Sequence, residues 1–106
     1  MSLPTITHLQ FLVIVEILGG ATRGRDLRER LKKAGVRQSG PAFYQMMASL
    51  EDNGFVSGWY EQQVIDSQIL RERHYKVLAA GRKAAETSHG FYHSIRRRDV
   101  GLAYAR

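Results

Sequence analysis

Hydrophobic residues recur along this chain with two different periods, and each period predicts a different element. Between residues 38 and 53, the i, i+3, i+4, i+7 positions of a helix with one buried face hold Phe43, Met46, Met47 and Leu50. Aromatic and β-branched residues are frequent in FVSGWYEQ and RERHYKVL, which predicts two strands. A loop over residues 63–70, containing VIDSQIL, is expected between the strands because this segment is too long for a tight turn.

Three further helices are predicted, two before the Phe43 helix and one after the strands. The first runs from about Thr7 to Leu18 and is apolar almost all round, so we expect a second subunit to cover part of it. The second, ATRGRDLRERLKKAG, buries its two leucines and takes Thr22 as N-cap. The last begins near Ala79 and contains two glycines that weaken it.

The order helix, helix, helix, hairpin, helix is that of a winged helix-turn-helix, a mainly α fold with a small β-hairpin. It has a three-helix core, a two-stranded wing and a C-terminal helix. We expect residues 7–94 to form this DNA-binding domain, with the C-terminal helix serving dimerisation. Residues 1–6 are then an N-terminal extension, partly of cloning origin, and residues 95–106 a basic C-terminal tail.

Charge indicates the class of partner. The 106 residues carry a formal net charge of +6, which favours nucleic acid first and an anionic membrane surface second. Residues 21–37 and 71–83 hold most of the cations, whereas residues 38–70 hold none. No cationic face lies opposite bulky apolar residues, so a membrane is not expected as partner. The longest apolar run, FLVIVEILGG, is too short to cross a bilayer and is not a secretory signal, so we expect a cytoplasmic protein.

Three blocks of sequence carry a resemblance to a known family. The third helix begins SGPAFY, LEDNGF leads from it into the wing, and RERHYKVLAAG returns from the wing. Over roughly residues 7–90 the chain resembles the PadR-like winged-helix transcriptional regulators. The resemblance implies a homodimeric repressor whose first and last helices form the dimer, with a small apolar effector in some members. The sequence departs from the family pattern at the wing tip and in its shorter C-terminal region.

The outer face of the third helix is expected to read DNA. Glutamine can pair with adenine in the major groove, and an alanine methyl can contact the thymine methyl. Cations flanking the helix are expected to bind phosphates, which gives salt-dependent affinity that is blind to sequence. We assign the recognition helix contacts to Ser39, Ala42, Tyr44, Gln45 and Ser49, phosphate contacts in the second helix and turn to Arg23, Arg25 and Arg37, and wing contacts to Arg71, Arg73, His74 and Lys76.

The dimer contact is assigned to apolar residues of the first and last helices, namely Phe11, Ile14, Val15, Phe91, Tyr92 and Ile95. Trp59 is expected to pack under the wing, the alternative being an effector pocket at the dimer interface. No cofactor, metal or catalytic activity is expected. The chain has no cysteine, His89 and His93 lack a nearby third ligand, and no phosphate-binding loop or catalytic motif is present.

Two other functions fit the same predicted fold. A winged helix that binds protein would use FYH and VIDSQIL as an exposed hydrophobic patch. An accessory factor of a mobile element would bind DNA without regulating transcription. Salt dependence separates the first from a DNA-binding protein, because phosphate contacts weaken as salt rises. Genomic context separates the second.

Overall fold

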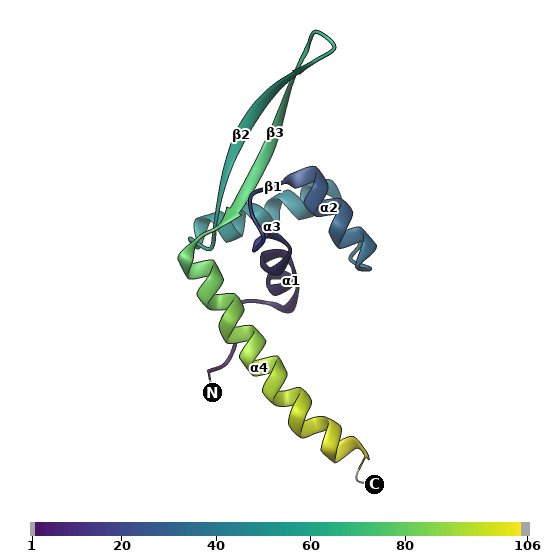
Figure 1. The fold of residues 1–106 in the computed structure, drawn as a ribbon, viewed down its shortest axis with the longest axis vertical. Coiled ribbons are helices and arrows are strands. Elements are labelled where there is room, and N and C mark those ends of the chain that lie inside the picture. Colours follow the sequence, from purple (N-terminus) through teal and green to yellow (C-terminus); the bar gives the residue numbers. More distant parts are fainter. Residues whose placement is uncertain (1, 105–106) are drawn as a thin grey trace.

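The structure, a computed structural model, describes the backbone of residues 2–104 and the side chains of residues 2–95. Its elements are α1 His8–Ile17, β1 Thr22–Arg23, α2 Gly24–Lys33, α3 Gly40–Asp52, β2 Val56–Ile65, β3 Gln68–Val77 and α4 Ala79–Tyr104 (Figure 1). This order is the predicted winged helix-turn-helix, with one short strand added before α2. The strands form one antiparallel sheet in the order β1–β3–β2.

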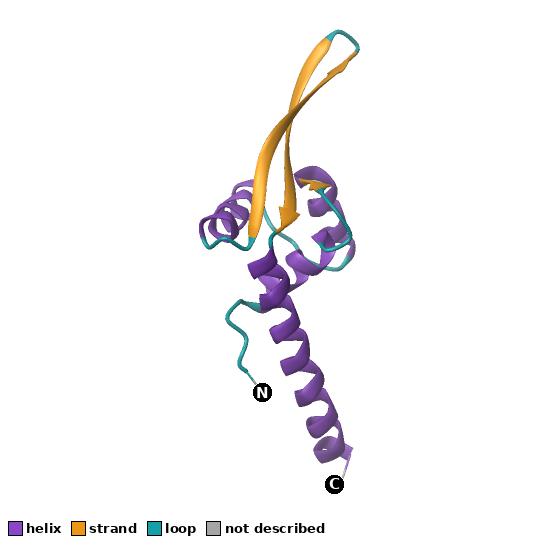
Figure 2. Ribbon diagram, turned by 60° about the vertical axis from the view of Figure 1, so that its left-hand side comes forward, coloured by secondary structure: helices purple, strands orange, loops and turns teal. Residues whose placement is uncertain are grey.

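The three short helices form the centre of the molecule, and the wing and α4 leave it in opposite directions (Figure 1). Figure 2 shows the two long strands twisting about each other beyond the helical body. The principal extents of 65 × 26 × 22 Å reflect these two projections. The base of the wing contacts the core, and α4 contacts α1 as far along as Tyr92, whose ring lies against Phe11.

The core gathers side chains from every helix and from the base of the sheet. The predicted buried face of α3 is confirmed for Phe43, Met47 and Leu50, while Met46 is half-buried at the edge of the core. The predicted burial of Leu27 and Leu31 on α2 is also confirmed. The remaining fully covered side chains include Val13, Ile14, Ile17, Val56 and Tyr75.

Local sequence sets most of the helix ends. Thr7 and Gln10 form a reciprocal capping box at the start of α1. Ser39 caps α3 by accepting a hydrogen bond from the Ala42 N–H, and Pro41 lies in the first turn. After α3, Gly54 takes a φ of 76°, which allows the Phe55 N–H to donate to the Leu50 carbonyl and close the helix.

Thr22 is not the N-cap of α2, contrary to the prediction. It lies in β1, where it pairs with Tyr75 of β3, and its hydroxyl donates to the Gly20 carbonyl. Arg23 occupies the N-cap position without a side-chain cap. Pairing with a distant strand decides the conformation here, and a local pattern contains no information about that partner.

The loop predicted over residues 63–70 is wrong, because the strands continue through it. Pairing runs without a gap from Val56 opposite Val77 to Ile65 opposite Gln68, so the turn consists of Asp66 and Ser67 alone. Their φ angles of 51° and 65° are those of a type I′ turn, whose twist matches the strands. The β-branched residues on both sides of the turn favour extended backbone. The wing is therefore a long hairpin with a two-residue turn.

α4 continues unbroken to Tyr104, through the boundary expected between residues 94 and 95. Its two glycines have different surroundings. Gly81 is buried, and a Cβ there would overlap the Phe55 carbonyl oxygen, which accepts a hydrogen bond from the Leu78 N–H. Gly90 faces open space. The first glycine is therefore required for the close approach of α4 to the end of α3.

Substituting these two glycines with alanine should change stability in opposite directions. Gly81→Ala should lower the free energy of unfolding by about 2 kcal/mol, since the Phe55 backbone has no room for a methyl group. Gly90→Ala should raise it by roughly 0.5–1 kcal/mol, because alanine is the better helix former. Urea unfolding followed by circular dichroism measures both. Equal stability of the two variants would mean that the Gly81 contact is not close.

Candidate nucleic-acid interface

The outer face of α3 is exposed and free of cations, as predicted. Its exposed side chains are Ala42, Tyr44, Gln45, Ala48 and Ser49. The Tyr44 ring stacks on Phe43 at a centroid distance of 5.0 Å and lies against Gly24, where a Cβ would approach it to 3.2 Å. The small residue at the start of α2 thus lets Tyr44 lie between α2 and the wing. This face therefore carries side chains that can form hydrogen bonds and small side chains that allow close approach, and none of them is charged.

Arg73 of β3 ties the wing to the C-terminal end of α3. Its guanidinium donates to the Glu51 carboxylate and lies 4.7 Å from the centroid of the Tyr60 ring. Burial lowers the pKa of Arg73, and the hydrogen bond and charge of Glu51 more than offset this, so the pKa is raised overall. Only 25% of its side chain is exposed. Arg73 was predicted as a phosphate contact, and the structure gives it a carboxylate partner inside the protein.

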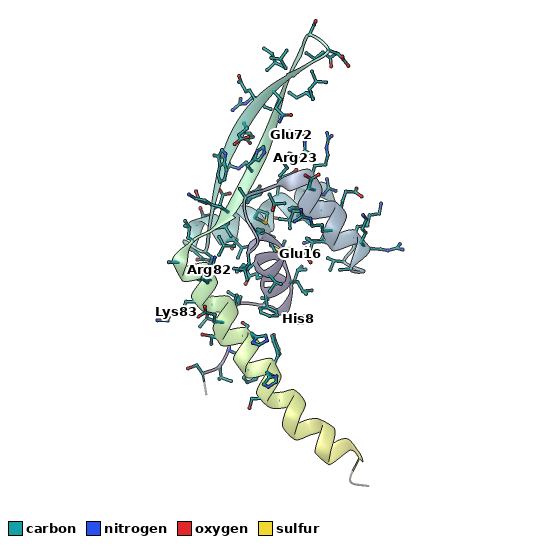
Figure 3. All side chains as sticks on the ribbon, viewed as in Figure 1. His8, Glu16, Arg23, Glu72, Arg82 and Lys83 are labelled. Atoms are coloured by element: carbon teal, nitrogen blue, oxygen red, sulfur yellow. The ribbon has the colours of Figure 1, made fainter. Side chains whose placement is uncertain are left out.

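Arg23 is also engaged with carboxylates (Figure 3). It donates to Asp26 at 3.0 Å and to Glu72 of the wing at 3.1 Å. The hydrogen bond with Asp26 raises the pKa of Arg23 and lowers that of Asp26. Arg25 reaches Glu72 only at 3.8 Å, and 73% of its side chain is exposed. Arg23 therefore joins α2 to the wing, whereas Arg25 remains accessible.

The other residues predicted as wing contacts are likewise either exposed or held by partners within the protein. Arg71 lies over the Tyr60 ring at 4.5 Å and is exposed, as is Lys76. His74 stacks on Trp59, and its Nε2 lies 3.4 Å from the Glu61 carboxylate, which leaves 12% of the side chain exposed. Trp59 thus packs at the base of the wing. Of the wing residues, the accessible cations are Arg71 and Lys76.

Two concavities flank α3. One, of about 560 Å³, lies between α3 and the wing and is bordered by Ala48, Tyr60 and Arg71. The other, of about 760 Å³, lies between α2 and the start of α3 and includes Arg37 and Ser39. Arg25 and Tyr44 line both, so the two concavities adjoin at these side chains.

Arg28 and Lys32 also line the larger concavity and were absent from the sequence assignment. The signal that identifies them is their spacing from Arg25. Positions i, i+3 and i+7 lie on one side of a helix, and in α2 these positions are Arg25, Arg28 and Lys32. A helical projection of the cations alone would have found the stripe.

The residues predicted at the dimer contact differ in accessibility. Ile14 is fully buried inside the chain, so its assignment to a contact with another chain is corrected. Phe11 and Tyr92 lie 5.6 Å apart and join α1 to α4 within one chain. Val15 is exposed, whereas Phe91 and Ile95 are half-buried. Because α1 is apolar all round, its pattern alone could not separate the core-facing side from the outer one.

Within the described residues, no group of three His, Asp or Glu side chains is arranged to hold a metal ion. The His89 and His93 rings stack at 6.1 Å on α4. No helix in this part of the chain has the length and apolar character needed to cross a membrane.

No protein-family model and no curated protein matches this chain. Solved structures do match it. A PadR family transcriptional regulator from Eggerthella lenta is 18% identical, with 92% of this chain and 83% of that chain covered and a TM-score of 0.72. The chain has the fold of the PadR-like winged-helix regulators. The resemblance seen in the sequence is thereby confirmed for the fold.

Two further matches extend this comparison. The structure of smu.1704 from Streptococcus mutans UA159 is 17% identical, covers 100% of this chain and 96% of that one, and has a TM-score of 0.77. Bacillus subtilis PadR, solved in complex with operator DNA, is 16% identical with a TM-score of 0.61, covering 81% of this chain and 47% of that one. At such identities the PadR-like fold is shared, and the residues that contact a ligand have to be argued from this chain itself.

Tyr75 supplies a pH-dependent test of how the wing base is packed. Its burial, with the nearby charge of Glu51, raises its pKa from 10.0 to about 12. Because this pKa is higher in the folded than in the unfolded state, its stabilising contribution is complete below pH 10 and is lost as the pH rises towards 12.

A pH titration monitored by tyrosinate absorbance should therefore show a late step, near pH 12, from Tyr75. Tyr75→Phe should remove this step. If the step is absent while the circular dichroism is still that of the folded protein, the ring is not buried as described.

Proposed function

We propose that this chain is a sequence-specific double-stranded DNA-binding transcriptional regulator, acting as a homodimeric repressor that occludes a pseudo-palindromic operator. The observation that carries the proposal is the neutral, exposed face of α3 with accessible cations on both sides of it. Such a helix suits the major groove, because base edges are read by hydrogen bonds and apolar contact while phosphates are bound by flanking cations.

The structural neighbours support the same function. Among them is Bacillus subtilis PadR with operator DNA, and several others are described as transcriptional regulators. The residues of this chain fit a binding role and not a catalytic one, since the candidate interface offers arginines, tyrosines and small polar groups without a nucleophile beside a base. We propose that the protein acts in the cytoplasm, where a bacterial operator is accessible.

On DNA, two copies of α3 would enter successive major-groove segments on one side of the duplex. Gln45 would read adenine, Ala42 and Ala48 would approach thymine methyl groups, and Tyr44 and Ser49 would hydrogen-bond to the backbone or base edges. Arg25, Arg37, Arg71 and Lys76 would bind phosphates. Arg23 and Arg73 would contribute by holding the wing in place, since each already faces a carboxylate, and His74 would join the two strands of the wing through Glu61.

Dimerisation would use the outer side of α1 and the adjoining part of α4. Val15 is the exposed branched residue on α1, and Phe91 and Ile95 are half-buried on α4. A small apolar effector, which the resemblance implies for some members, would bind at this contact. Trp59 stacks on His74 within the sheet and would take no part in this contact.

A specific observation also favours the alternative of a protein-binding winged helix. The wing tip exposes Val64, Ile65, Ile69 and Leu70, and residues 61–70 contain no lysine or arginine. An apolar tip suits a protein surface better than a phosphate backbone. DNA binding and protein binding would then use different parts of the same wing, its base and its tip.

The proposed function is tested by selection from a random duplex library at moderate salt. The wild-type protein should retain an inverted repeat with half-sites about one helical turn apart. Gln45→Ala should relax the preference at one or two base pairs, with unchanged stability because the side chain is exposed. Gln63→Ala on the wing is the matched control and should keep the wild-type motif. Recovery of no motif by the wild type would reject sequence-specific binding.

The dimer contact is tested by mass in solution. Val15→Lys places a charge on the outer side of α1 and should shift the light-scattering mass from dimer towards monomer. Val64→Lys makes the same change at the exposed wing tip and should leave the mass unchanged. The reverse result, with only Val64→Lys dissociating the protein, would place the self-contact on the wing.

A further inference from the structure

Most of a stripe of cations on α2 has no ion-pair partner among the described side chains, and its first member, Arg25, reaches Glu72 only at 3.8 Å. Arg25, Arg28 and Lys32 occupy one side of the helix, and Arg37 follows in the turn before α3. Within residues 2–95, Arg28, Lys32 and Arg37 form no salt bridge. This distinguishes them from Arg23 and Arg73, whose charges are balanced by carboxylates.

The stripe borders the concavity of about 760 Å³ at the start of α3. Its apolar wall consists of Leu31, Val36 and Phe43, and Glu29 is the one carboxylate among the residues that line it. Arg28 lies 6.0 Å from the centroid of the Phe43 ring, and its guanidinium lies 3.5 Å from the Cβ position of Gly40. Its cation is therefore held directly beside the first turn of the recognition helix.

The stripe is also long enough for more than one phosphate. From Arg25 to Lys32 the helix rises by about 10 Å, whereas phosphates of one DNA strand follow each other every 3.4 Å along the duplex axis. The concavity adjoins the one at the wing at Arg25 and Tyr44. Exposed cations therefore line both sides of α3, with Arg71 in the wing concavity and Arg28, Lys32 and Arg37 in the other.

We propose that Arg28 and Lys32, together with Arg25 and Arg37, form a phosphate-binding site for consecutive phosphates of one DNA strand beside the recognition helix. The inference rests on the proposed function and adds Arg28 and Lys32 to the phosphate contacts that Arg25 and Arg37 would make. It also explains how α3 can lack cations, because the charge that holds the backbone comes from the neighbouring helix. A phosphate group of a small molecule has the same chemistry and is the other source to be distinguished.

The test compares two double variants that lose the same charge. Arg28→Ala/Lys32→Ala removes two cations of the stripe, and Arg82→Ala/Lys83→Ala removes two exposed cations from the first turns of α4, away from α2 (Figure 3). Affinity for a labelled duplex of the selected sequence and for one of random sequence is measured by fluorescence anisotropy from 50 to 300 mM salt. Thermal melting checks that each variant is folded.

The stripe variant should bind both duplexes roughly 60-fold more weakly near 0.1 M salt. Its plot of log affinity against log salt should be flatter by about 1.8, as expected for two lost phosphate contacts. The α4 variant should keep nearly the wild-type slope. Arg28→Lys/Lys32→Arg should also keep the wild-type slope, because both charges are retained. If Arg28 acted only by packing its guanidinium against Phe43, this variant would not restore binding.

A stripe variant with the slope of the α4 variant would overturn the site while leaving DNA binding by the wild type intact. Wild-type protein that binds neither duplex would instead reject the proposed function, and the site with it. Whether the site instead binds the phosphate group of a small molecule is tested with sodium pyrophosphate at constant ionic strength. If pyrophosphate saturably shifts the arginine side-chain NMR signals assigned to Arg28 and duplex DNA does not, the site takes a free phosphate ligand and the backbone assignment is wrong.

Discussion

The contact between Glu51 at the end of α3 and Arg73 at the base of the wing sets the geometry on which the rest of the interface depends. A DNA-binding winged helix uses its recognition helix and its wing together, so the position of the wing relative to that helix determines the shape of the interface. Gly58 makes the contact possible, because a side chain there would overlap the Glu51 carboxylate. Arg23 and Glu72 repeat the arrangement between α2 and the wing. Two ion pairs therefore orient a hairpin that projects well beyond the helical body (Figure 2).

Using cations to hold the wing has a consequence for binding. An arginine paired with a carboxylate offers little net charge to a phosphate, since bringing DNA close would repel the carboxylate as well. The accessible charge is instead on Arg25, Arg28, Lys32 and Arg37 beside α3, and on Arg71 and Lys76 in the wing. In the proposed complex, affinity and sequence preference would be separated, because cations flank α3 while α3 itself would present neutral groups to the bases.

Local patterns were sufficient where local physics decides the outcome. The buried face of α3 follows from helical spacing, and Phe43, Met47 and Leu50 are buried in the structure. Prediction failed where a distant partner decides. Thr22 was wrongly assigned as a cap, since the β1 strand that contains it forms only by pairing with β3. A loop was wrongly predicted at the wing tip, since strand pairing extends β2 and β3 to a two-residue turn.

The same distinction applies to the candidate site. Exposure of Gln45 and Ser49 follows from the spacing of α3, but a sequence does not indicate which arginines have carboxylate partners 22 or 49 residues away. Ile14 was misassigned for a related reason, since a helix that is apolar on all sides does not reveal which side faces the core.

Likeness to structures at 16–18% identity with TM-scores of 0.61–0.77 means that very different surfaces are compatible with this fold. The fold is built by the buried face of α3 and by the α1, α2 and wing residues packed against it, whereas an operator would be chosen by a few exposed groups on the opposite face of α3. Because those groups are small and neutral here, hydrogen bonding and shape, not charge, would decide which sequence is bound.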